Sequence, residues 1–97
     1  MAQEITIEKV KRYIRISHHK LDAEVADDID ECLADLVSVG LVAPDETDPL
    51  ILAAIKNHAK SNFLDDAEES AEYLNRYEKQ KASLMMNDDY RGGGYVQ

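Results

Sequence analysis

The chain has 97 residues, 44% hydrophobic and 32% charged, which is enough for one small domain with a single modest core. A net charge of −9 argues against a protein that grips nucleic acid, and a lone cysteine excludes an intramolecular disulfide framework. Because no apolar run reaches signal-peptide or membrane-spanning length, we expect a soluble protein made in a reducing cytoplasm, with no membrane partner.

The first predicted helix has its N-cap at Thr6 and ends near Ile16. Residues 1–20 carry a net charge of +3, although the whole chain is acidic. The basic side of this helix consists of Lys9, Lys11, Arg12 and Arg15. We therefore expect a short helix with an apolar inner face and a basic outer face.

The second predicted helix follows the polar connection SHHK and bears an apolar stripe that stops at Gly40, a common helix terminator. Its outer side carries acids without an intervening cation: Glu24, Asp27, Asp28, Asp30, Glu31 and Asp35. Like charges four residues apart cost a helix roughly 0.2 to 0.5 kcal/mol per pair. Either this face simply stays in solvent, or it meets a basic partner. One such partner is the basic helix of a neighbouring copy, in a head-to-tail contact that can close into a ring.

The third predicted helix lies in DPLILAAIKNHAKSNF, residues 48–63, with Asp48 as N-cap and Pro49 at its first position. Apolar residues and His58 cover roughly 220° of this helix, about twice the width that a surface helix needs. Its wet side is predicted to consist of Lys56, Asn57, Lys60 and Ser61. Either the helix is central in the fold, or another chain covers part of it. The candidate interface residues are Leu50, Ile51 and Phe63.

The fourth predicted helix starts at a capping-box-like pair, Asp66 and Glu69. Its inner side is predicted to comprise Tyr73, Leu74, Tyr77, Lys81, Leu84 and Met85. With no strand alternation and no internal repeat, the sequence predicts an all-α fold. Residues 1–85 would form a small four-helix domain with short loops.

Residues 86–97 contain three successive glycines and no helical period, which predicts a flexible C-terminal arm. Tyr90 and Tyr95 are candidate anchors for docking this arm on a neighbour or another partner. The alternative is an arm that stays disordered in every state.

The reactive residue types are not spaced for catalysis or metal binding. His18 and His19 are adjacent in a short loop, so they do not readily face one ion, and no Cys or His lies at ligand spacing. His58 is expected to be a hydrogen-bonded core or interface histidine, and Cys32 a buried, inert thiol. RGGGY lacks the Lys-Ser/Thr of a phosphate loop. We expect no enzyme, no cofactor and no metal.

Three stretches resemble the small head-tail connector proteins of long-tailed bacteriophages, also called adaptor or DNA-packaging proteins. ITIEKVKRYIRI at 5–16 is similar to their opening helix, of the type Leu-Thr-Leu-Glu-Glu-Val-Lys-x-Tyr-Leu-Arg-Ile. AIKNHAKSNFLDD at 54–66 and AEYLNRYEKQKASL at 71–84 are similar to their third and closing helices. The resemblance covers residues 5–84, although SHHKLD stands where many members have an acidic loop.

The resemblance implies a ring, commonly of twelve subunits, beneath the phage portal. Such a ring extends the DNA channel and docks the next head-completion or tail protein. DNA passes through its lumen only as cargo, and the acidic second helix is a candidate lining because acidic walls let the duplex slide. The expected location is the virion's head-tail interface, after a period in the host cytoplasm.

Two alternatives stay open. A small helical DNA-binding or antitoxin-like regulator fits the basic first helix and the SHHK turn, but the helix after this turn carries acids instead of groove-reading side chains. An adaptor that mimics DNA through its acidic face would bind a basic host protein instead.

Overall fold

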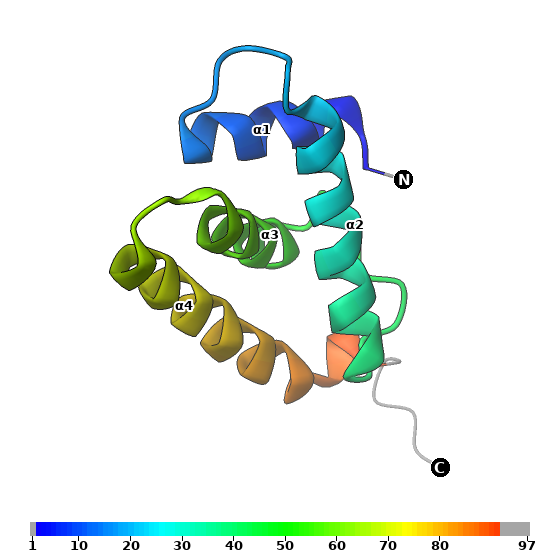
Figure 1. The fold of residues 1–97 in the computed structure, drawn as a ribbon. Helices are drawn as coiled ribbons and strands as arrows, with labels where there is room; N and C mark the ends of the chain where they lie inside the picture. Colours follow the sequence, from blue (N-terminus) through cyan, green and yellow to red (C-terminus); the bar gives the residue numbers. More distant parts are fainter. Residues whose placement is uncertain (1, 92–97) are drawn as a thin grey trace.

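The computed structural model describes residues 2–91 of the protein (Figure 1). Its helices are α1 (Glu4–Ile14), α2 (Asp22–Ser38), α3 (Pro49–Phe63), α4 (Ala67–Met85) and a short 3-10 helix, η1 (Asp88–Tyr90). The described part of the chain contains no strand, so the predicted all-α, four-helix fold is confirmed.

Helix α3 lies at the centre of the fold. In Figure 1 it sits between α1 above, α2 along one side and α4 below, and it packs against all three. Ile51, Ala54, Ile55 and Ala59 of α3 are fully buried. The width of its apolar face therefore reflects a central position. Ile51, expected at an interface with another chain, lies in the core instead, whereas Leu50 is 55% exposed.

Part of the predicted wet side of α3 is also inside. Asn57 and Ser61 are buried, contrary to the sequence-based expectation. The hydroxyl of Tyr13 on α1 donates to Asn57 Oδ1 over 2.9 Å, and Asn57 Nδ2 donates to Gln80 Oε1 on α4 over 2.9 Å. These bonds satisfy a buried amide and link three helices.

The local start signals of α3 and α4 are confirmed. The Asp48 carboxylate accepts a hydrogen bond from Leu50 N over 2.9 Å, with Pro49 at the first helical position. Asp66 Oδ1 likewise accepts from the backbone N–H groups of Glu68 and Glu69. Both side chains bind N–H groups that the helix itself leaves unpaired.

The predicted N-cap of α1 is wrong. This helix begins at Glu4, so Thr6 lies inside it, and the actual N-cap residue, Gln3, makes no side-chain cap. Glu46, in the loop between α2 and α3, supplies the missing acceptor. Its Oε2 accepts from Gln3 N over 2.8 Å and from the Thr6 hydroxyl over 2.9 Å. A side chain distant in sequence therefore caps α1.

Residues 86–91 fold back onto the domain, which corrects the prediction of an arm starting at Met86. The Tyr90 hydroxyl donates to the Asp48 carboxylate over 3.0 Å, and Val42 N donates to Tyr90 O over 2.9 Å. Arg91 Nη1 also donates to the backbone oxygen at the end of α4 over 3.1 Å. Tyr90 therefore binds its own domain. Tyr95 and the rest of the predicted arm lie outside the described residues.

Candidate interaction surfaces

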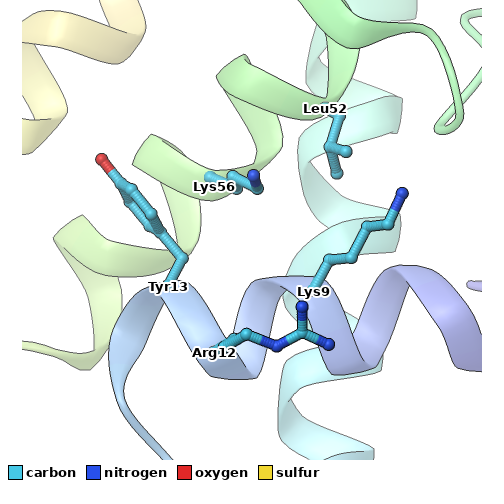
Figure 2. A pocket seen from close by; sticks show the side chains of 5 residues that line it. All are labelled: Lys9, Arg12, Tyr13, Leu52 and Lys56. Carbon is cyan, nitrogen blue, oxygen red and sulfur yellow. The ribbon is translucent and has the colours of Figure 1, made fainter.

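A shallow groove of about 360 Å³ runs between α1 and α3. We call it the basic groove, and its lining consists of Lys9, Arg12, Tyr13, Leu52 and Lys56. Figure 2 shows Lys9 and Tyr13 extending from α1 toward α3, which contributes Leu52 and Lys56, while Arg12 lies along α1. The spacing explains the arrangement, because residues three and four apart share one helix face on α1, as do Leu52 and Lys56 on α3. The groove thus combines three cations with an apolar floor.

The charges of the basic groove are not compensated within the described chain. Lys9, Arg12 and Lys56 form no ion pair with any residue between 2 and 91. Other cations do pair: Lys11 Nζ lies 2.7 Å from an Asp22 oxygen, and Lys81 Nζ lies 2.9 Å from an oxygen of Asp35. The groove is therefore a place where a partner's carboxylates or phosphates can supply the missing negative charge.

Tyrosine rings hold the neighbouring lysines in place. The ammonium groups of Lys56 and Lys60 lie 5.8 and 4.8 Å from the centre of the Tyr13 ring. Lys60 also lies 4.8 Å from the centre of the Tyr73 ring, which meets Tyr13 edge to face at 6.4 Å. Such contacts contribute about 0.5 to 1 kcal/mol at exposed sites. They orient the lysines without neutralising their charge.

Only part of the predicted acidic face is available to a partner. Glu24, Asp27 and Glu31 are exposed and, with Asn62 and Phe63 of α3, line a hollow of about 290 Å³. We call these five residues the acidic surface. None of its three acids forms an ion pair within residues 2–91. Phe63, predicted at an interface, is half-buried beside them.

Asp28 belongs to the interior instead of the outer face. Its side chain is buried, accepts a hydrogen bond from Asn62 Nδ2 over 2.6 Å and lies 3.0 Å from His58 Nδ1. The His58 ring packs edge to face on Tyr77, with 4.9 Å between centroids. The expectation of a hydrogen-bonded histidine is confirmed. Asp28 stabilises the α2–α3 contact; it borders the hollow beside the acidic surface, but its carboxylate is already hydrogen-bonded within the chain.

Asp35 was also predicted for the acidic face, yet it points toward α4. Its carboxylate accepts hydrogen bonds from the Tyr77 hydroxyl over 2.6 Å and from Lys81 Nζ over 2.9 Å. The bond from Tyr77, followed by that from Lys81, lowers the pKa of Asp35. Asp35 therefore joins α2 to α4 as an ionised side chain.

Cys32 behaves as the sequence predicts. It is fully buried in the core, and burial raises the pKa of its thiol to about 12. A thiol without its thiolate form is a poor nucleophile.

Near the start of α2, Glu8, His19 and Asp22 place ligand atoms within 4.8 Å of one another. The ammonium of Lys11 already lies among them, 2.7 Å from Asp22 Oδ1, 3.6 Å from Glu8 Oε2 and 3.3 Å from His19 Nδ1. Hydrogen bonding to Asp22 raises the pKa of Lys11, which keeps it charged. The centre of this cluster is the ion pair between Lys11 and Asp22. Lys11, which was expected on the basic outer face of the first helix, is buried.

The remaining predicted interface residues are dispersed. Arg15 is exposed, but it forms the left-handed C-cap of α1 with φ 64° and does not line the groove. Leu50 lies at the start of α3 and Phe63 at its end, so the two do not share one surface patch. Sequence reasoning missed Leu52 and Lys56 as groove residues, since their helical spacing shows a shared face but not that α1 lies opposite.

Comparisons of the chain with protein-family models, with characterised proteins and with solved structures found no match. Among residues 2–91, no helix has the length and apolar composition needed to cross a membrane.

Proposed function

We propose that this protein is a structural head-tail connector that forms a ring beneath a bacteriophage portal. The ring extends the DNA channel and docks the next head-completion or tail protein. The observation that carries the proposal is the separation of two uncompensated charged surfaces, the basic groove and the acidic surface, on one small helical domain. The resemblance over residues 5–84 supports it.

Two unlike surfaces on one chain allow head-to-tail association of identical copies. Contacts of this kind generate rings when the rotation between neighbours closes, and filaments when it does not. A ring whose basic grooves are covered by acidic neighbours also exposes few free cations to a passing duplex. Phosphate binding depends on such cations, so DNA would slide through as cargo.

The proposed partners are other copies of this chain, the portal and the downstream head-completion or tail protein. We propose no enzymatic activity, cofactor or resident metal. In this function the protein occupies the host cytoplasm until it joins the head-tail interface of the virion.

Electron microscopy of portal complexes from the same phage, with and without this chain, tests the proposal. We expect an additional ring of density beneath the portal when the chain is present. An unchanged portal at saturating concentrations of the protein would contradict the connector function.

A small DNA-binding or antitoxin-like regulator is the second candidate. The unpaired cations of the basic groove favour it, whereas the exposed acids of α2 oppose an approach to phosphate. Binding to duplex DNA, measured at low and high salt, separates the two functions. Tight binding that falls steeply with salt favours the regulator, because phosphate contacts release counterions.

A further inference from the structure

We infer that the basic groove of one copy binds the acidic surface of a second copy of this chain. The inference rests on the proposed function and deepens it, since it names the contact that joins neighbours in the ring. The groove cations are Lys9, Arg12 and Lys56. In the proposed contact they meet Glu24, Asp27 and Glu31 of the second copy.

Charge complementarity is the first argument. Within residues 2–91, all three groove cations and all three acids lack an ion-pair partner. Other charges of α1 and α2 are already used inside the fold, as in the Lys11–Asp22 pair. Each surface therefore lacks in its own chain what the other surface supplies. Complementary potentials of this kind favour correct partners and suppress like-charged ones.

The second argument is the apolar surface beside the charges. Exposed ion pairs contribute little alone, so an interface also needs apolar area. Leu52 and the ring of Tyr13 form the floor of the basic groove, and an adjoining hollow of about 370 Å³ extends it toward Ala53. Phe63 is half-buried next to the acids. Docking the acidic surface of one copy into the basic groove of another would cover the apolar floor of the groove and Phe63 together.

The two surfaces are different, so the contact is heterologous. A copy whose basic groove is filled still presents its own acidic surface to the next copy. Association therefore continues beyond a dimer, and it ends in a ring when the rotation between neighbours closes. A nucleic acid in the same groove would leave the acids of α2 without a cationic partner, whereas a second copy supplies partners for both surfaces, which makes a second copy the better occupant.

Three double variants test the contact. The first reverses the groove with Arg12→Glu and Lys56→Glu, and the second reverses the acidic surface with Asp27→Lys and Glu31→Lys. The third, Lys20→Glu with Lys79→Glu, is the matched control. It changes two exposed cations outside the groove and shifts the net charge by the same amount as the first. Circular dichroism verifies that each variant is folded.

Sedimentation velocity at concentrations up to about 1 mM detects contacts with millimolar dissociation constants. At low salt we expect the wild type and the control to associate, and high salt to weaken this because it screens exposed charges. Each reversed variant alone should associate at least about tenfold more weakly, since its two surfaces carry the same sign.

An equimolar mixture of the two reversed variants should associate again. The unchanged acids of the first meet the unchanged groove of the second, and the two reversed surfaces match each other. The proposal is overturned if the wild type shows no salt-sensitive association, if the mixture stays monomeric, or if either reversed variant alone behaves like the wild type. Duplex DNA binding that only the groove variant loses, with self-association unchanged, would assign the groove to nucleic acid instead.

The portal experiment distinguishes failure of this contact from failure of the function. Ring density beneath the portal together with a mixture that does not associate leaves the function standing and removes the contact. Association of the mixture without density beneath the portal keeps the contact and removes the connector function.

Discussion

Replacing Glu46 by alanine should destabilise α1, although Glu46 is not part of that helix. Its carboxylate is buried and binds both Gln3 N and the Thr6 hydroxyl, over 2.8 and 2.9 Å. The first N–H groups of a helix have no partner within the helix, and Gln3 supplies no cap of its own. Alanine at position 46 removes the only side chain that the described chain places at these donors.

The expected cost follows from two lost interactions. Removing a helix cap costs about 0.5 to 2 kcal/mol. The buried hydroxyl of Thr6 also loses its acceptor, at about 1 kcal/mol. We expect the free energy of unfolding to fall by about 2 kcal/mol, which for a domain of this size lowers Tm by roughly 8 to 16 °C.

Thermal and urea unfolding followed by far-UV circular dichroism measures this effect. Glu46→Gln keeps an acceptor oxygen and should lose roughly half as much. Glu4→Ala is the matched control, because Glu4 is an exposed acid in the first turn of the same helix, where its charge contributes at most about 1 kcal/mol through the helix dipole. If Glu46→Ala is no more damaging than Glu4→Ala, Glu46 does not cap α1.

Three further predictions concern the interior. Tyr77→Phe removes a hydrogen bond to the ionised Asp35 and should lower the free energy of unfolding by about 1.5 to 3 kcal/mol. Tyr73→Phe, whose hydroxyl has no hydrogen-bond partner within residues 2–91, should be near neutral in urea unfolding. In the folded state the pKa of Asp35 lies below its ordinary value of 3.8. The stability that ionised Asp35 contributes to the fold is therefore complete above pH 3.8 and is lost as the pH falls through the lower, folded-state pKa. Asp35→Asn should therefore flatten the acid limb of a Tm-against-pH curve, and an unchanged limb would contradict this assignment. The Cys32 thiol, with a pKa of about 12, should react with a thiol reagent only in denaturant, and rapid labelling of the native protein would refute its burial.

The helix starts and stops that the sequence predicts correctly depend on neighbouring residues. Asp48, Pro49 and Asp66 act within one helical turn, because a cap binds N–H groups two or three positions away. Gly40 acts locally too, since its φ of 108° is unfavourable for other residues. The core stripe of α2 follows from helical period alone, which is why burial of Cys32 was predictable.

The candidate site was only half predictable. Lys9 and Arg12 are recognisable as a basic helix face, and Glu24 as part of an acidic one. Their partners in each surface come from another helix: Lys56 completes the basic groove, and Phe63 borders the acids. The helical period gives the direction in which a side chain points around the axis of its helix. It does not tell which helix lies in that direction.

By itself, the sequence determined four helices, most of their ends and the wide apolar face of the third helix, because caps, terminators and period are local properties. That this helix is central was decided by tertiary packing. Tertiary structure decided which polar side chains became internal. Lys11 and Asp28 look like exposed charges on their own helices, yet both are buried against a partner from a neighbouring element. Asp35 stays partly exposed, but its carboxylate is bound by Tyr77 and Lys81 of α4. Glu46 caps a helix that begins more than 40 residues earlier. A buried polar group is stable only where a complementary group meets it, and that meeting depends on how the helices pack.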